Sequence, residues 1–180
     1  MGRVMNRQRW AAAGAVAVAF VVAGLVWFRP WALWVDKTVD EALPSAAPRT
    51  ASAGESSPRV PTAPVTVAHG TFISHEHATS GAVKIVRLAD GSHTLRFEGL
   101  ETSNGPDLRV RLSDAPVKEG RAGWFVFDEG QYVNLAKLKG NKGDQNYQLP
   151  ADLDWSAYTS VSIWCDRFDV SFGAARLVRT

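Results

Sequence analysis

The sequence predicts an all-β domain over residues 67–180, built as an antiparallel β-sandwich or a Greek-key barrel. Several short runs in this region alternate apolar and polar residues, which is the period of a half-buried strand. Clusters of Gly, Asn, Asp and Pro separate the runs, as turns do in sandwiches and barrels. No window of ten or more residues in this region shows helical periodicity.

Five strands are predicted from this alternation, at residues 82–88, 93–97, 108–112, 161–165 and 170–174. The first two are joined around Asp90 and Gly91, a pair typical of tight hairpins. Residues 138–144 are rich in Gly and Lys but lack the Gly-Lys-Ser/Thr ending and the following helix of a phosphate-binding loop. They are therefore predicted to form a turn.

A membrane-spanning helix is predicted at residues 10–28. These nineteen residues carry no charge, and their number matches the ~20 residues that cross a bilayer. The basic segment 1–9 precedes them, so the positive-inside tendency places the N-terminus in the cytoplasm and the C-terminal domain outside it, with a single pass through the cell membrane. A cleavable signal peptide is the alternative, but its apolar region is usually only about 7–15 residues long. An uncleaved signal anchor is therefore favoured.

An extracytoplasmic flank and a flexible, disordered linker are predicted at residues 29–66. Of the 26 residues from Glu41 to Thr66, 19 are Ala, Pro, Ser, Thr or Gly, so the stretch has too little apolar surface to offset the entropy of ordering it. From Val67 on, 13 Lys and Arg face 14 Asp and Glu. The domain is near neutral, and no nucleic-acid partner is expected.

Cys165 is the one cysteine of the sequence and ends a predicted strand. Because the chain has no second cysteine, Cys165 cannot form an intramolecular disulfide even in the oxidising environment outside the cytoplasm. It is therefore an inert buried thiol, a partner in an intermolecular disulfide, or a reactive or ligating sulfur. Strand parity places Val161 and Ile163 on the same face as Cys165, and Ser162 and Trp164 on the other. The thiol is therefore expected to point toward the core.

Histidines provide a second set of candidates. His75 and His77 would lie on one face of an extended chain and are candidate metal ligands, because imidazole together with thiolate suits a transition metal or a haem iron. Two histidines at this spacing also occur on ordinary polar surfaces. No nucleophile elbow or other catalytic constellation has the required spacing, so the chain is not expected to be an enzyme by itself.

Four stretches of the domain form a pattern that is specific only in combination. They are His69-Gly70-Thr71-Phe72 with Thr79-Ser80-Gly81, Gly105-Pro106-Asp107-Leu108 with Val110 and Leu112, residues 138–147, and Val161-Ser162-Ile163-Trp164-Cys165 with the residues up to Leu177. Together they resemble the DM-thirteen domain family, also called the electron-transfer DM domain, over almost all of residues 69–178. The N-terminal anchor is also similar to single-pass actinobacterial members.

The resemblance implies an extracytoplasmic, membrane-tethered module in electron transfer, with Cys165 as its suspected redox group. That cysteine would act as a free thiol or as a ligand to a prosthetic group, for which haem and copper are the candidates. In animals and plants such domains accompany cytochrome modules, for which the anchor and linker leave no room, so a separate redox partner protein is expected. The alternative is a cell-envelope module that binds protein or glycan, in which Cys165 is only a core residue.

Overall fold

The computed structural model describes residues 14, 16–26, 35–44 and 63–180. The chain divides into two compact units, residues 1–35 and residues 36–180. The predicted cytoplasmic segment, both ends of the predicted membrane span, and most of the predicted linker lie outside the described residues.

The first unit contains a helix, seen at the described residues 14 and 16–26. In the part of the chain that the structure describes, no helix combines the length and the apolar composition needed to cross a membrane.

The second unit is made mainly of β-strands, which confirms the all-β prediction. In chain order the strands are β1 Thr38–Asp40, β2 Val65–Ser74, β3 Ser80–Arg87, β4 His93–Glu101, β5 Leu108–Ser113, β6 Tyr132–Lys137, β7 Lys142–Gln148, β8 Ser160–Cys165, β9 Val170–Arg176 and β10 Val178–Arg179. Short 3₁₀ helices lie in the connections, η2 Gly120–Gly123, η3 Val126–Asp128 and η4 Trp155–Ala157.

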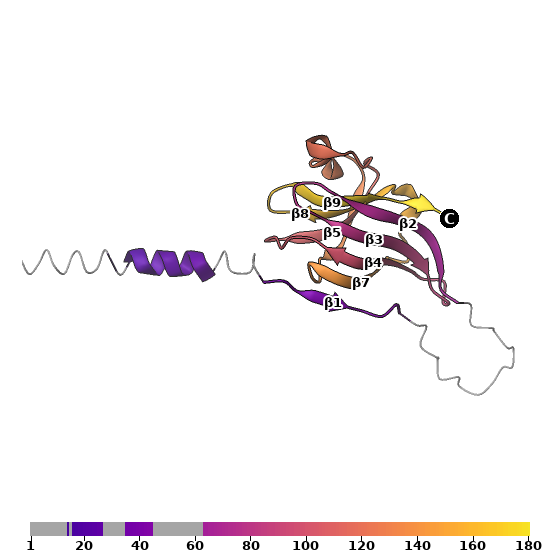
Figure 1. Ribbon diagram of the computed structural model, residues 1–180, viewed down its shortest axis with the longest axis horizontal. Helices are drawn as coiled ribbons and strands as arrows, with labels where there is room; N and C mark the ends of the chain where they lie inside the picture. The colour runs from indigo at the N-terminus through magenta and orange to yellow at the C-terminus, as the bar shows by residue number, and fades with distance from the viewer. Residues whose placement is uncertain (1–13, 15, 27–34, 45–62) are drawn as a thin grey trace, which may run out of the picture. The chain divides into compact units, whose positions relative to one another are not determined.

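The strands form one sheet in the order β1-β7-β4-β3-β2-β9-β8-β5-β6, with β10 paired to β2 beside this path (Figure 1). The paired neighbours are antiparallel except β1 and β7, which are parallel. β6 and β7 stand near opposite ends of this order, yet only residues 138–141 connect them. Because so short a connection has little reach, the sheet must curl until its two ends approach each other.

The predicted sandwich or barrel therefore takes the form of a single curled, mixed sheet. Two separate sheets do not form because β2 serves both halves, pairing with β3 through residues 65–71 and with β9 through residues 72–74. Bulges next to Gly81 (φ 120°) and Gly99 (φ 56°) interrupt the ladders on either side of β4 and add curvature. The expectation of purely antiparallel pairing is wrong at β1, a strand within the predicted flank that joins the edge of β7 in parallel.

Two groups of buried side chains hold the domain together. The principal core lies inside the curled sheet and includes Cys165. A second core consists of Ala115, Phe127, Trp164 and Ala174, with Val117 and Val126 packed against it. It lies between the outer side of β8 and β9 and residues 114–131, which link β5 to β6. As a result all six residues of β8 are buried.

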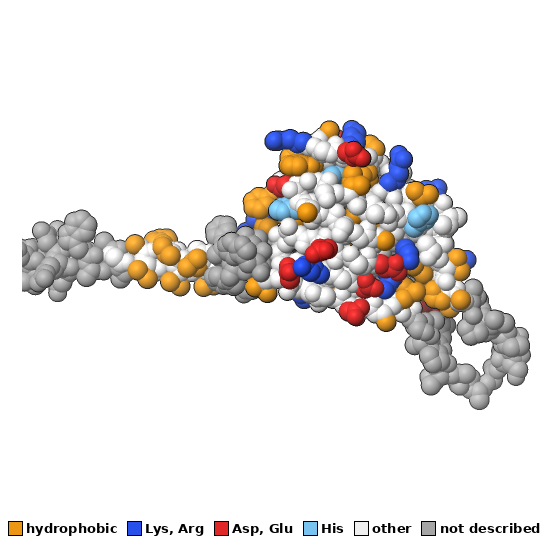
Figure 2. All heavy atoms as spheres, in the orientation of Figure 1, with side chains coloured by type: hydrophobic (Ala, Val, Ile, Leu, Met, Phe, Trp, Pro, Cys, Tyr) orange, Lys and Arg blue, Asp and Glu red, His pale blue; other side chains and the backbone are white. Residues whose placement is uncertain are grey.

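The surface of the domain mixes charges of both signs. Figure 2 shows Lys and Arg side chains interspersed with Asp and Glu on the visible face. Ion pairs at the surface, such as Lys84 with Glu98 (2.6 Å) and Lys142 with Asp36 (2.7 Å), connect neighbouring segments.

Candidate functional site

Cys165, the central candidate, is the last residue of β8 and is fully buried, with 0% of its surface exposed. Its cross-strand partners are Leu108 of β5 and Val170 of β9, and both belong to the principal core. Ile163 lies in the same core, whereas Trp164 belongs to the second core on the other side of the strand. The strand parity predicted from the sequence is confirmed, and the thiol points inward.

The surroundings of Cys165 do not fit a haem or copper site. A haem or a copper ion held through this sulfur would need further ligands, usually imidazole or thioether groups. The strands on either side instead place Leu108 and Val170 against the cysteine. Among the described residues, no group of three or more His, Cys, Asp and Glu side chains is arranged to hold a metal ion. What the structure provides at this position is a shielded free thiol.

His75 is a buried histidine with both ring nitrogens engaged. It follows β2 and is 7% exposed. Its Nδ1 lies 2.8 Å from the Ser171 hydroxyl and its Nε2 lies 3.1 Å from the Lys118 carbonyl oxygen. Because a carbonyl can only accept, Nε2 carries the hydrogen, and Nδ1 accepts from Ser171. Burial lowers the pKa of His75, which favours the neutral ring.

The hydrogen bonds of His75 belong to a longer chain on the outer side of the sheet. Ser162 of β8 donates to Ser171 of β9 at 2.9 Å, Ser171 donates to His75, and His75 donates to Lys118. The imidazole also stacks on Phe127 of the second core, with ring centroids 5.8 Å apart. This chain fastens residues 114–131 to the sheet, and every imidazole nitrogen in it is used for that purpose.

His77 lies in different surroundings from His75. The chain bends at residues 75–77, so the extended conformation that would place both rings on one face is not formed. The His77 ring packs on Phe172 of the principal core at a centroid distance of 3.9 Å, and its Nε2 lies 3.8 Å from a carboxylate oxygen of Glu76. The two histidines and Cys165 thus contact different neighbours.

Arg111 is a buried cation that the sequence analysis does not identify. It is 3% exposed, and its guanidinium lies between two rings, 4.1 Å from the centroid of Tyr132 and 4.5 Å from that of Trp164. It donates to Asp166 at 2.9 Å and to Asn134 at 2.8 Å. Stacking between aromatic faces and charge-assisted hydrogen bonds are the interactions that stabilise a buried guanidinium. Arg111 therefore fixes Trp164, the residue next to Cys165.

The signal for Arg111 is weak in the sequence because it occupies an ordinary alternating position. In the run from Leu108 to Leu112, the two arginines are the polar partners of apolar residues, which predicts a solvated face. Arg111 becomes buried because the rings of Tyr132 and Trp164 enclose it and the Phe127 carbonyl approaches it from residues 114–131. A local sequence pattern does not show that residues distant in the sequence will bury one of its polar positions.

Comparison with curated proteins and with solved structures gives no match. The family model described as electron transfer DM13 matches residues 71–177. This region begins within β2 and includes β8 with Cys165, whereas β1 lies before it. The resemblance to this family is confirmed over more than half of the chain. The chain therefore belongs to the DM13 electron-transfer family.

Proposed function

We propose that the chain is a membrane-tethered module that takes part in electron transfer outside the cytoplasm, with Cys165 as its redox group. The family match carries this proposal, because residues 71–177 contain the whole of β8 and therefore Cys165. The uncharged segment 10–28 with basic residues before it supports the tether and its orientation. A separate redox protein is the proposed donor or acceptor of electrons.

The apolar surroundings support a free thiol rather than a ligand to a prosthetic group. Thiol–disulfide exchange requires contact between the attacking thiolate and a sulfur. With Cys165 fully buried, such contact requires β8 and its neighbours to open locally. The rate at which the thiol reacts is therefore expected to report how often this end of the sheet opens.

Purification of the full chain in detergent and without chelator tests the proposal. A visible spectrum, a metal analysis and a thiol titration are made on one sample. The expected result is no haem band, no stoichiometric metal, and one thiol that reacts slowly in the native protein and rapidly in denaturant. A haem band or stoichiometric copper that disappears in Cys165→Ala would overturn the free-thiol proposal.

A second candidate function is a cell-envelope module that binds a protein or a glycan. The complete burial of Cys165 in the principal core favours it, because a free cysteine there behaves as a small hydrophobic residue. Aromatic side chains that such a module could use are exposed at Phe125 (44%), Tyr132 (41%) and Phe168 (63%). Cys165→Ala separates the two functions. Loss of electron transfer to the partner by a variant that remains folded supports the redox module, and full retention supports the binding module.

A further inference from the structure

A short segment that precedes the family-matched region docks on the edge of β7. Thr38 to Asp40 of β1 pair in parallel with Lys142 to Asp144. The ladder extends beyond the strand at both ends, since Lys142 donates to the Lys37 carbonyl at 3.3 Å and Glu41 donates to the Asp144 carbonyl at 3.0 Å. We call residues 36–42 the docking segment.

The edge of β7 is shaped for the backbone of the docking segment. A Cβ atom on Gly140 would lie 2.3 Å from the carbonyl oxygen of Lys37, and one on Gly143 would lie 2.1 Å from that of Val39. Gly143 also has φ 92°, which L side chains rarely adopt. Only glycine allows the segment to approach this closely at both positions.

Asn141 holds the first end of the docking segment. Its side-chain oxygen accepts from the backbone N–H of Lys37 at 2.7 Å, and its Nδ2 donates to the Asp36 carboxylate at 2.7 Å. Nδ2 also donates to the Thr102 carbonyl at 3.0 Å, which fixes the orientation of the amide. Lys142 adds an ion pair with Asp36 at 2.7 Å. Asn141 is 1% exposed, so this contact is made by a buried amide that is already oriented.

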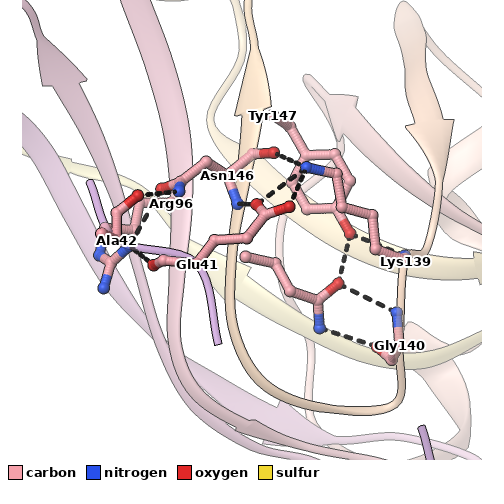
Figure 3. Close-up of polar contacts among 8 residues, drawn as sticks. Glu41, Ala42, Arg96, Lys139, Gly140, Asn146 and Tyr147 are labelled. Atoms are coloured by element: carbon pink, nitrogen blue, oxygen red, sulfur yellow. Dashed lines mark hydrogen bonds and ion pairs between the residues drawn. The ribbon is translucent and has the colours of Figure 1, made fainter. Parts of the chain in front are cut away.

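Glu41 holds the second end (Figure 3). Its two carboxylate oxygens each lie 2.8 Å from Lys139 Nζ, and one of them accepts from the backbone N–H of Asn146 at 2.8 Å. Arg96 donates to the Glu41 carbonyl at 2.8 Å, and the Asn146 side chain donates to the Ala42 carbonyl at 2.8 Å. The hydrogen bond from Lys139 lowers the pKa of Glu41, as expected for a carboxylate bound in its charged form.

We propose that the edge of β7 is a strand-docking site whose ligand is the acidic docking segment, and that this non-covalent contact alone is sufficient to hold the domain to the N-terminal part of the chain. The site combines a backbone ladder with oriented polar groups at both ends, which is how sheet edges bind extended peptides. β1 begins ten residues after the predicted span ends at Phe28, whereas β2 begins only at Val65. The docking segment therefore joins the sheet although it precedes residues 45–62 in the sequence.

A cleavage experiment on the full chain tests this attachment. A specific protease site is introduced at residues 52–56, within the Ala- and Ser-rich part of the predicted linker, and an affinity tag is placed at the N-terminus. The protein is kept in detergent, cleaved to completion and captured by the tag. The expected result is that the fragment carrying residues 63–180 remains with the tagged fragment. Immediate release of that fragment would overturn the proposal.

Variants of the docking segment identify the contact and leave the sequence of the rest of the domain unchanged. Glu41→Gln keeps the shape but removes the charge, and is expected to speed release of the cleaved fragment about fivefold to tenfold. Val39→Pro removes a backbone donor inside the strand and is expected to abolish retention. Asp40→Asn is the matched control, because Asp40 is exposed and its side chain forms no ion pair within the described part of the chain.

The control is expected to release the fragment at the wild-type rate. Equal release from wild type, Glu41→Gln and Val39→Pro would overturn the assignment of the site. The assay uses neither the thiol of Cys165 nor insertion into a membrane. Its outcome is therefore independent of the proposed electron transfer.

Discussion

The two sides of β8 are equally buried but differ completely in chemistry. The inner side presents Val161, Ile163 and Cys165 to the principal core. The outer side presents Ser162 and Trp164, which contact a network of hydroxyl, imidazole and guanidinium groups. The polar side resembles a site more closely, yet each of its hydrogen bonds described above has a structural use, whereas the inner side carries the free thiol.

The polar residues of the outer side serve the backbone of the segment that covers them. Ser160 donates to the carbonyls of Ser113 (3.0 Å) and Ala115 (2.8 Å), and His75 donates to that of Lys118. Ser113 also accepts from the Thr159 backbone N–H at 3.0 Å, but the buried Ala115 carbonyl lies beyond the end of β5, and a buried carbonyl without a partner is costly. The loop of residues 114–131 therefore needs polar side chains beneath it to bond its backbone carbonyls. A strand in the same place would bond its carbonyls to the backbone of a neighbouring strand instead.

Removal of the Trp164 side chain is expected to cause the largest loss of stability. Trp164→Ala empties the centre of the second core and removes one of the two rings that enclose Arg111. A loss of about 3–5 kcal/mol in the free energy of unfolding is expected, measured by denaturant titration. Phe168→Ala, at a 63% exposed position in the next turn, is the control and should change stability by less than about 0.5 kcal/mol. A loss below about 1 kcal/mol for Trp164→Ala would mean that the packing of residues 114–131 on β8 contributes little to the stability of the domain.

Cys165→Ser tests the apolar character of the inner side. The hydroxyl would be buried next to Leu108 and Val170 without a partner, and a loss of about 2–3 kcal/mol is expected. Cys165→Ala lacks the polar group and should lose only about 1–2 kcal/mol. If serine proved less damaging than alanine in the same denaturant titration, the sulfur would have to face a polar group, and the site would need to be described differently.

Five of the ten strands in the described part of the chain could be predicted from the sequence because their alternation is local. The predictions at 82–88, 93–97, 108–112, 161–165 and 170–174 fall on β3, β4, β5, β8 and β9. β7 was not predicted because its sequence, Lys-Gly-Asp-Gln-Asn-Tyr-Gln, has no apolar alternation. Gln145 nevertheless lies in the interior with 0% exposure, since its amide bonds both the N–H and the carbonyl of Gly140 and accepts from Tyr147. A polar side chain satisfied in this way leaves no signal in a hydropathy pattern.

The site could be predicted only where it depends on one strand. The inward direction of Cys165 followed from parity, which is a property of β8 alone. The burial of Arg111 depends on Tyr132 of β6 and Trp164 of β8, and the pairing of β1 depends on β7, a strand about a hundred residues later in the chain. Such long-range contacts are determined by tertiary packing, and short stretches of sequence do not predict them.

Ser171→Ala is expected to produce a smaller loss on the outer side. Without the hydroxyl, Nδ1 of His75 loses its donor and Ser162 loses its acceptor. Two buried groups left with fewer partners correspond to a loss of about 1–2 kcal/mol in the free energy of unfolding. Ser92→Ala provides the control, because Ser92 bonds Asp90 in an exposed turn. Equal effects of the two substitutions would show that the chain through Ser171 contributes no more than a surface turn.

The pH dependence of stability is expected to show the smallest effect and to originate at His75. Burial lowers the pKa of His75 in the folded domain below its ordinary value of 6.5, so the unfolded chain binds the proton more readily than the folded domain. The contribution of the neutral ring is fully present above pH 6.5 and is lost as the pH falls below it. Protonation would place a second donor on Nδ1, opposite a Ser171 hydroxyl that already accepts from Ser162. Denaturant titrations between pH 7.5 and 5 should therefore show a decline that His75→Gln lacks, while an identical slope in both proteins would assign the decline to other groups.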